Sequence, residues 1–521
     1  MIERVAARAI YPERKFYLDY IARCGDASSF FTHPLDGCAR ALEARSRLDY
    51  PRETICDRLA AYNTRLTDSP AVLANIADLR VRSTFCVISG QQVGFLGGPI
   101  YTCYKIMTTI RLAASLQERL GVRVVPLFWL ANEDHDFTEI NHARFLKDDG
   151  EVGAIRFEWE ERGRPIADLP LSDEIRSAYS AYFDALPPGP HHADTRDLFA
   201  PKQGEDYCTW HARLFAQVFS KQGLVIVEPS LLRTSGRTFF RVALERHTRI
   251  QERLEKTAAE LREAGYSPPL DPAQAGGLYT FDATGRRVRV TDSLSHLPAV
   301  DEHPERYSPD AALRPLFADS LLPVLASVLG PGEIAYHAML KPLYSLFNLP
   351  QPLLFPRLSY TIIDHAETDL ISRFGTNIGE ILDATFTAEE AMRSLAPPDL
   401  QERFAKAREA IIEDLAQLRS VVALLDPSLE RSWEGTRAAS LRAVDRLESR
   451  ALRAASAKHG LSTGAFQRLR NAILPRGRPQ ERVFPLPYFI NRHGPRFVER
   501  LLSAGELDNS SHCVVTWEDD D

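Results

Sequence analysis

The sequence lacks the features that mark disulfide-rich, zinc-knuckle and membrane-spanning proteins. Its seven cysteines are an odd number, are widely spaced and include no Cys-x-x-Cys pair. This pattern argues against a disulfide framework and a structural zinc site, so we expect reduced, mostly buried thiols and no bound metal. The longest apolar stretches, such as 124–131 and 321–329, fall far short of the roughly 20 residues that span a bilayer.

An excess of positive charge is also absent. The 63 Lys and Arg against 70 Asp and Glu give a net charge of -7, so we expect neither nucleic acid nor a membrane as a partner. Residues 1–16 contain Glu3 and Pro12 and no apolar run, which is not typical of a signal peptide. We therefore expect a cytoplasmic globular protein, and 521 residues with 44% hydrophobic content suffice for several cores.

The regular pattern that is present begins with an alternation of strand and helix. A β-rich run at 84–88 is followed by a glycine-rich loop, a helical period over 101–120 and a second β-run at 122–131. This order predicts a parallel crossover and therefore an α/β sheet. Further strands are expected at 223–230 and 351–363. The segments at about 148–206 and 234–300 have mixed patterns and are interpreted as insertions in a core of residues 1–383.

Residues 384–475 have a different composition, rich in Ala, Glu, Arg and Leu. Their apolar side chains follow the spacing of a coiled-coil seam: Phe404, Ile411, Leu415, Leu418, Val422 and Leu425. A break at Pro427 and a second helical segment at about 428–474 predict an antiparallel hairpin, about 40 Å long for roughly 28 residues per helix. A helical bundle packed on the core is the alternative, because periodicity does not distinguish the two. We expect residues 476–521 to pack back on the core.

Two loops at the carboxyl ends of consecutive predicted strands carry the densest polar residues. The first, SGQQVGFLGGP, offers Gln91 and Gln92 as donors and acceptors, and its glycines permit close approach of the backbone to a ligand: Gly94, Gly97 and Gly98. Ligands bind at this edge of open parallel sheets. The loop matches neither the Walker nor the GxGxxG pattern, so a simple tight turn is the alternative.

The second loop places four titratable residues in a row directly after an apolar strand: Glu133, Asp134, His135 and Asp136. Charged groups at the end of an apolar strand cost free energy unless they take part in binding or catalysis. His135 could act as a general base beside a carboxylate. One alternative is a loop whose aspartates cap the next helix. A metal site is another, although it would need further converging oxygen ligands.

Basic residues also follow later turns and strands, in the segments 303–323, 330–341 and 357–359. Side chains such as Arg306, Arg314 and Arg357 suit the bidentate binding of carboxylates or phosphates. Each of them alone is more often part of a surface ion pair.

Taken together, several long strings resemble the bacillithiol biosynthesis cysteine-adding enzyme family, BshC. They include SGQQVGFLGGPIYTCYK, WLANEDHDFTEINH, HPERYSP, LRPLFADSLLP, GPGEIAYHAMLK, PRLSYT and QERVFPLPYFINRHGPRFVERLL, in this order and over nearly the whole chain. Two positions depart from the usual family pattern, because Asp310 stands where Asn is usual and Ala318 where Gln is usual.

The resemblance implies a Rossmann-like core related to class I aminoacyl-ligase domains, connecting insertions, and a coiled coil that forms a homodimer. It also implies a ligase that joins cysteine to glucosaminyl-malate in the last step of bacillithiol biosynthesis. The chain contains no HxGH string, no KMSKS-like string and no Cys/His set for a cysteine-selecting zinc. Direct adenylation of cysteine by ATP is therefore left open, and a nucleotide-binding scaffold without catalytic activity is the alternative function.

These considerations assign a role to each candidate residue. His135 or Asp136 is expected to be the catalytic base, with Glu133 and Asp134 beside it, and Gln91, Gln92 and the loop amides are expected to bind the reacting carboxyl. Lys105, Arg306 and Arg357 are expected to bind anionic groups. The remaining expected substrate contacts are Tyr101, His303, Glu333, Tyr336 and Ser359.

ATP or ADP is expected to bind elsewhere, where the coiled coil rejoins the core. The predicted contacts are Gln480, Arg482, Tyr488 and Asn491, which offer an aromatic face and polar groups. The alternative is that this aromatic stretch only anchors the C-terminus.

Overall fold

A five-stranded parallel sheet lies at the centre of the computed structural model, which describes residues 2–133, 137–159 and 163–518. Its strand order is β11-β10-β2-β3-β6, and every neighbouring pair is parallel. The strands are β2 (Phe85–Gln92), β3 (Val124–Ala131), β6 (Val225–Val227), β10 (Val324–Leu329) and β11 (Leu353–Pro356). The predicted α/β class is therefore confirmed.

The sheet is buried on both faces, which is why its strands are almost entirely apolar. All eight residues of β3 are buried, and its alternate side chains enter different cores. Leu127 and Trp129 belong to the largest hydrophobic cluster, whereas Phe128 and Leu130 belong to a second one. The helix α6 (Tyr101–Leu120) connects β2 to β3 and ends at Gly121, whose φ of 65° closes the helix in the left-handed region.

The strand order reverses beside β2. The chain runs outward from β2 through β3 to β6, and it later returns to the other side of β2 with β10 and β11. The order corresponds to 3-2-1-4-5 in a doubly wound sheet, with the switch point between β2 and β10. The carboxyl ends of these two strands are thus the expected ligand edge.

The prediction of one strand over 351–363 is wrong. The structure has β11 in the central sheet and β12 (Tyr360–Ile363) in a second sheet of order β1-β13-β12, with β1 (Ile2–Ala6) and β13 (Ser511–Thr516). The chain leaves one sheet for the other at residues 357–359, where buried Arg357 and Ser359 contact other segments. A continuous apolar run does not reveal such a change of sheet. The strand β10, which lies in the apolar run at 321–329, was not predicted either.

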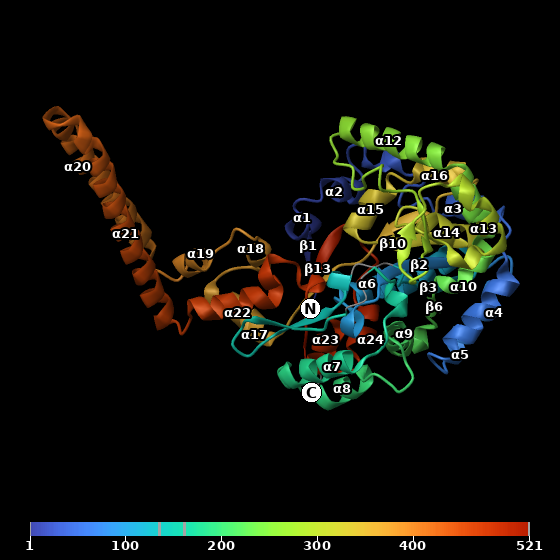
Figure 1. Ribbon diagram of the computed structural model, residues 1–521. Helices are drawn as coiled ribbons and strands as arrows, with labels where there is room; N and C mark the ends of the chain where they lie inside the picture. The colour runs from blue at the N-terminus through green and yellow to red at the C-terminus, as the bar shows by residue number, and fades with distance from the viewer. Residues whose placement is uncertain (1, 134–136, 160–162, 519–521) are drawn as a thin grey trace.

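Helices and short strands surround the central sheet (Figure 1). Before β2 the helices are α1 (Ala7–Ile10), α2 (Lys15–Ala22), α3 (Cys38–Ser46), α4 (Arg52–Asn63) and α5 (Pro70–Leu79). Between β3 and β10 lie β4 (His142–Leu146), β5 (Val152–Arg156), α7 (Asp173–Ala185), α8 (His192–Phe199), α9 (Tyr207–Val218), α10 (Ser230–Arg233), α11 (Arg237–Glu245), α12 (His247–Glu263), β7 (Leu278–Phe281), β8 (Arg287–Arg289), α13 (Leu297–Glu302), β9 (Ser308–Pro309) and α14 (Arg314–Leu321). The segments interpreted as insertions therefore contain ordered helices and strands.

After β10 the chain forms α15 (Pro331–His337) and α16 (Lys341–Leu346), and after β12 it forms α17 (His365–Phe374), α18 (Ile378–Leu382) and α19 (Ala388–Arg393). The long helices α20 (Pro398–Leu425) and α21 (Glu430–Lys458) then form a hairpin that projects far from the globular part (Figure 1). The predicted second helical segment is divided, because Gly460, with φ of 67°, separates α21 from α22 (Thr463–Ile473).

The last segment of the chain lies against the core. It contains α23 (Leu486–His493), α24 (Phe497–Ser503) and β13, and α23 packs on α8. The carbonyl of Phe484 accepts a hydrogen bond of 2.9 Å from the Ile100 N–H, beside the glycine-rich loop. Across the described residues, no helix combines the length and apolarity needed to cross a membrane. All seven cysteines are free thiols.

Candidate active site

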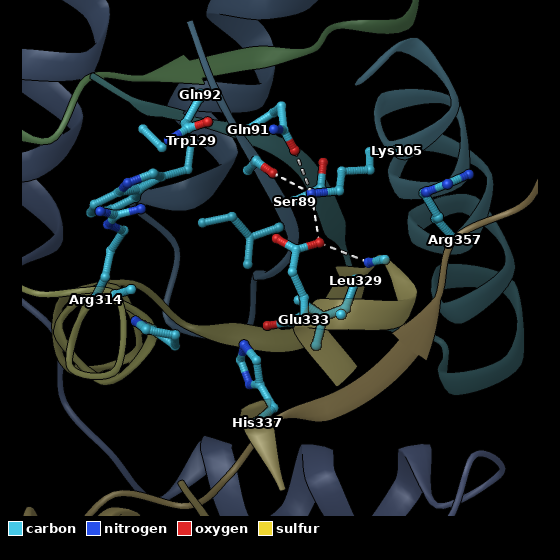
Figure 2. A pocket seen from close by; sticks show the side chains of 18 of the residues that line it. Ser89, Gln91, Gln92, Lys105, Trp129, Arg314, Leu329, Glu333, His337 and Arg357 are labelled. Carbon is cyan, nitrogen blue, oxygen red and sulfur yellow. Dashed lines mark hydrogen bonds and ion pairs between the residues drawn. The ribbon is translucent and has the colours of Figure 1, made fainter. Parts of the chain in front are cut away.

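A cavity of about 410 Å³ opens at the switch point of the sheet. Its walls come from the carboxyl ends of β2, β3 and β10, from the first turns of α6 and α14, and from α15 (Figure 2). Polar or charged side chains that line it are Ser89, Gln91, Gln92, Tyr101, Lys105, Trp129, Glu139, Arg314, Asp319, Ser327, Glu333, Tyr336, His337, Arg357 and Arg482. The cavity therefore lies where the strand order predicts a small-molecule site.

An ion pair between buried Lys105 and partly exposed Glu333 lies in this cavity. The Lys105 Nζ is 2.6 Å from the Glu333 carboxylate, and it donates to the Gly90 carbonyl at 2.7 Å and to Gln91 Oε1 at 2.8 Å. Burial lowers the pKa of Lys105, and the Glu333 charge opposes that shift. Glu333 also accepts from the Gly330 N–H at 2.7 Å, which fixes the start of α15. Three acceptors thus use the three ammonium protons, and Lys105 holds Gln91 in place.

Four polar atoms in the cavity-lining residues are buried without a hydrogen-bond partner among the described residues. They are Ser89 Oγ, Trp129 Nε1, Arg314 Nε and His337 Nδ1. An unpaired buried polar atom costs about 1–3 kcal/mol, so native structures retain few of them. Their gathering around one cavity indicates that a polar ligand supplies the missing partners.

Arg314 is a partly buried cation in this wall that is available to a ligand. Its side chain makes no hydrogen bond or ion pair within residues 2–133, 137–159 and 163–518. It extends from the start of α14 on the side of the cavity opposite Arg357 (Figure 2). An unpaired guanidinium in a partly buried wall is suited to bind a carboxylate or phosphate through two parallel hydrogen bonds.

His337 contributes a neutral ring to the same cavity. Burial lowers its pKa to about 4, so the imidazole is uncharged near neutral pH. Its ring stacks on Tyr336 with the centroids 4.9 Å apart. Ser89, Trp129 and His337 were not among the predicted site residues, because each sits within an apolar strand or a helix and carries no local motif.

Arg357 lines the cavity but is already neutralised. Its two terminal nitrogens donate to both oxygens of Glu481, with Nη1 to Oε2 at 2.8 Å. Both groups are buried, and the arginine holds the pKa of Glu481 at about 2 against the effect of burial. Arg357 and Arg482 lie 5.4 Å and 5.3 Å from the ring of Tyr101, whose hydroxyl accepts from Gln91 Nε2 at 3.0 Å. These contacts fix the position of Tyr101.

The structure brings together about half of the predicted substrate contacts. The cavity includes Gln91, Gln92, Tyr101, Lys105, Glu333, Tyr336 and Arg357. His303 and Arg306 are exposed and lie outside the cavity lining, with His303 beside Glu305 and Arg306 near the Phe281 carbonyl. Ser359 also lies outside it, buried against Glu481 and His512.

The three loop glycines form a tight buried turn. Gly97 and Gly98 have φ of 90° and 70°, and a Cβ on Gly94 would approach the Gly98 Cα to 2.8 Å. The Gly94 carbonyl is 3.1 Å from His211 Nδ1. These contacts explain the glycines as turn residues outside the cavity lining, and ligand binding by the loop amides stays a prediction.

The acidic loop after β3 is only partly within the described chain. Asp134, His135 and Asp136 lie outside the described residues. Glu133 is buried, and its Oε1 accepts from Arg233 Nη2 at 2.7 Å and Nε at 2.9 Å. This ion pair gives Glu133 a structural partner, and its catalytic role stays a prediction.

The predicted nucleotide contacts do not converge on one cavity. Gln480 is buried and hydrogen-bonds the backbone of Ile362 and Ala472, while the Asn491 amide binds the backbone of 187–189. Tyr488 is buried and stacks on Phe484. Arg482 lines the switch-point cavity instead. Nucleotide binding by these four residues stays a prediction.

Two further observations concern the ligands that the chain can hold. Within the described ranges, no three His, Cys, Asp or Glu side chains gather closely enough to hold a metal ion.

Ala318 lines the cavity, whereas Asp310 lies outside its lining, buried against the N–H groups of Gly277, Ala312 and Leu313. Of the two departures from the family pattern, Ala318 is the one that changes the cavity wall.

Fold and cavity together define a doubly wound α/β protein with a small-molecule site at its switch point and a helical hairpin attached. Comparison of the sequence with family models gives the narrower assignment. Residues 3–358 match the model "Bacillithiol biosynthesis BshC, N-terminal Rossmann-like domain", and residues 360–517 match the "C-terminal coiled-coil domain" of the same family. The chain belongs to the BshC family of bacillithiol biosynthesis.

Curated relatives agree with this assignment. One from Geobacillus kaustophilus is 33% identical over 535 residues, covering 96% of this chain and 97% of the relative. One from Geobacillus thermodenitrificans is 31% identical over 495 residues, with 89% and 90% covered, and one from Bacillus cereus is 28% identical over 536 residues, with 97% and 98% covered. All three are described as "Putative cysteine ligase BshC".

Proposed function

We propose that this protein is a cysteine ligase that joins the carboxyl of cysteine to the amine of glucosaminyl-malate and so completes bacillithiol. A C–N bond forms while one C–O bond of the carboxyl breaks. The carboxyl oxygen leaves with the phosphoryl or nucleotidyl group taken from ATP, and the ammonium form of the amine loses two protons. The names of the relatives support the reaction class. The observation that carries the proposal is the cavity at the switch point, which combines a free guanidinium with unpaired neutral polar groups.

The functional groups of the proposed substrates complement the side chains that line the cavity. The malate part of the acceptor carries two carboxylates, which suit Arg314 in the cavity wall and Arg482 on its exposed side. Sugar hydroxyls can both donate and accept, as Ser89, Trp129 and His337 require. The two substrates together are small enough for a cavity of this size.

Amide formation also needs a base to remove a proton from the amine. A histidine with a pKa of about 4, such as His337, is protonated too weakly for this task and is better suited to hydrogen bonding. We assign the base to His135 or Asp136. His135→Ala and Asp136→Asn should leave the protein folded and abolish bacillithiol formation in cells. Normal thiol levels in cells carrying either variant would contradict the assignment.

The carboxyl must be activated before the amine attacks it, and the proposal gives this role to ATP as a co-substrate. Purified protein is incubated with cysteine, glucosaminyl-malate and ATP, and product and nucleotide are both measured. Amide product with stoichiometric loss of ATP is the expected result. ATP binding without product at any substrate concentration would instead favour a nucleotide-binding scaffold. ATP and free cysteine are cytoplasmic metabolites, so the proposal places the protein there.

The proposal also includes a homodimer formed through α20. Its apolar side chains near the hairpin tip are more than half exposed, at 54% for Leu418, 55% for Val421 and 78% for Leu425. They repeat at i, i+3 and i+7 and therefore share one helix face. A second copy is the commonest cover for such a face in soluble proteins.

A further inference from the structure

A buried carboxylate, Asp319, lies in the wall of the switch-point cavity. It is on the second turn of α14 and is only 1% exposed, yet it lines the cavity. A buried charge costs free energy unless its surroundings compensate it. The contacts of Asp319 therefore show how much of this carboxylate the chain itself uses and how much is left for a ligand.

Only one oxygen of Asp319 is used by the described part of the chain. The Tyr344 hydroxyl donates to Asp319 Oδ2 at 2.6 Å. Arg45 Nη2 is 3.9 Å from the same oxygen, which is too far for a hydrogen bond. No group among the described residues donates a hydrogen bond to the other oxygen, Oδ1. Since a carboxylate offers about four lone-pair sites, Asp319 can accept further hydrogen bonds from a ligand.

Arg45 on α3 balances the charge of Asp319 without occupying its carboxylate. Arg45 Nη1 donates to the Asp319 carbonyl at 2.9 Å, and Nη2 donates to the Pro350 carbonyl at 2.7 Å. Burial raises the pKa of Asp319 to about 6, and the charge of Arg45 opposes that shift. The carboxylate is therefore mostly ionised near neutral pH, and it keeps an oxygen for a cationic group.

Glu333 and Glu139 also line the cavity but are less suited to bind a cationic ligand. Glu333 is already in contact with an ammonium, because its carboxylate is 2.6 Å from Lys105 Nζ. Glu139 is exposed, and ion pairs in contact with water contribute little free energy. Asp319 combines burial with the lack of a directly bound cation in the described chain.

The proposed reaction brings two amines to this cavity, and the two must be in opposite protonation states. The amine of glucosaminyl-malate must lose its extra proton before it can attack the carboxyl. The α-amine of cysteine must stay protonated, because a free amine would attack the activated carboxyl of another cysteine. A nearby carboxylate raises the pKa of an amine and favours the ammonium form. Asp319 therefore suits the amine of cysteine and not the amine of the acceptor.

We propose that Asp319 binds the α-ammonium group of cysteine and thereby selects an α-amino acid for the reaction. This inference rests on the proposed function, to which it adds a contact that determines specificity. Tyr344 and Arg45 already hold the carboxylate in place, so little freedom is lost when the ammonium binds. Arg314, on the first turn of the same helix, remains available for the carboxylates of malate (Figure 2).

Calorimetric titration of the full chain with cysteine and with β-mercaptopropionate tests the inference. The second compound has the same thiol and carboxylate but no amine. The unmodified chain should bind cysteine at least about tenfold more tightly, because only cysteine forms the charge-assisted contact. Asp319→Asn keeps the shape of the side chain and an acceptor for Tyr344 but removes the charge. It should weaken the binding of cysteine about tenfold and should not weaken that of β-mercaptopropionate.

Two further variants control for a structural effect. Asp301→Asn removes a carboxylate that pairs with Arg241 outside the cavity lining, and it should bind both compounds like the unmodified chain. Circular dichroism checks that Asp319→Asn is folded. If it is not, the double variant Asp319→Asn/Arg45→Met takes its place, because it leaves no buried charge uncompensated, and the same loss of preference is expected.

The possible results separate this inference from the proposed function. Equal affinities of the unmodified chain for the two compounds would overturn the inference and leave cysteine as a substrate. The same conclusion follows if the Asp319 variant keeps the full preference for cysteine. Binding of neither compound at millimolar concentration, with glucosaminyl-malate and a non-hydrolysable ATP analogue present, would overturn the proposed function and the inference with it.

Discussion

At the scale of single residues, three of the four cations that line the cavity, all but the exposed Arg482, have different states. Lys105 is saturated by three acceptors, and Arg357 is neutralised by Glu481. Arg314 makes no such contact in the described chain and keeps a buried unpaired nitrogen. Only the last of these is free to bind an anionic substrate without first losing an internal partner.

Arg314→Gln should therefore raise KM for glucosaminyl-malate about tenfold or more, since charge-assisted hydrogen bonds are worth about 1.5–3 kcal/mol. The unfolding temperature should change little, because Arg314 has no hydrogen-bond or ion-pair partner among the described residues to lose. Steady-state kinetics and thermal unfolding measure the two effects.

Arg306→Gln is the matched comparison for this variant. Arg306 is exposed and lies outside the cavity lining, although sequence alone favoured it as a substrate contact. The KM of Arg306→Gln for glucosaminyl-malate should be close to that of the unmodified enzyme. A large rise in KM for Arg306→Gln with no change in KM for Arg314→Gln would show that the anionic group of the substrate binds outside the cavity.

At the scale of elements, the apolar seam of the helical hairpin is half-buried in one part and exposed in the other. Phe404, Ile411 and Leu415 are half-buried, and the indole of Trp433 on α21 donates to the Leu415 carbonyl at 2.6 Å. Leu418 and Leu425 belong to the same predicted seam but are exposed. One part of the seam therefore holds the hairpin together, and the other part is exposed, as the proposed dimer requires.

Replacing Leu418 and Leu425 with Glu should abolish the proposed dimer, because it puts charge into the exposed stripe and leaves the hairpin contacts intact. Light scattering at micromolar concentration should show monomers, with the helical content retained in circular dichroism. Ser420→Glu adds the same charge on another face of α20 and should remain dimeric. The interface assignment is wrong if the unmodified chain is already monomeric under these conditions.

At the scale of the whole molecule, one buried network joins four distant segments. Glu481 accepts from Arg357 in the core, from Ser359 Oγ at 2.9 Å and from the N-terminal Tyr11 hydroxyl. Ser359 Oγ is in turn 2.7 Å from His512 Nδ1 on β13. The network spans the junction between the matched family domains, at residues 358 and 360. It couples the cavity wall to the packing of both chain ends.

Glu481→Gln should reduce the free energy of unfolding by about 3 kcal/mol or more at neutral pH, because it leaves Arg357 buried without a counter-charge. The folded pKa of Glu481, about 2, is lower than its usual value of 4.5. Its stabilising effect is thus fully present above about pH 4.5 and is lost as pH falls toward 2.

Denaturant unfolding measured from pH 7 to pH 2 checks this sign. The unmodified protein should lose more stability than Glu481→Gln between pH 4.5 and 2. Glu499→Gln removes an exposed carboxylate paired with Lys221 and should cost less than about 1 kcal/mol. Parallel pH curves for the unmodified protein and Glu481→Gln would contradict the assigned role.

The sequence by itself determined the α/β class, the parallel crossover from β2 through α6 to β3, and the helical hairpin. These elements can be predicted because the spacing of apolar residues shows the local period, and glycine or proline residues mark where an element ends. It also predicted a site with Gln91, Tyr101, Lys105 and Glu333, which line the cavity, because they lie next to recognisable loops and helix starts. Each of these inferences rests on neighbours along the chain.

Only the tertiary structure decided which polar residues face one another. It separated Arg306 from the cavity, paired Arg357 with Glu481 across 124 residues, and assembled Ser89, Trp129, Arg314 and His337 around one space. It also moved 360–363 into a second sheet. The physical reason is that hydrogen bonds, ion pairs and burial depend on distance in space, and residues far apart in the chain carry no local sign of their partner.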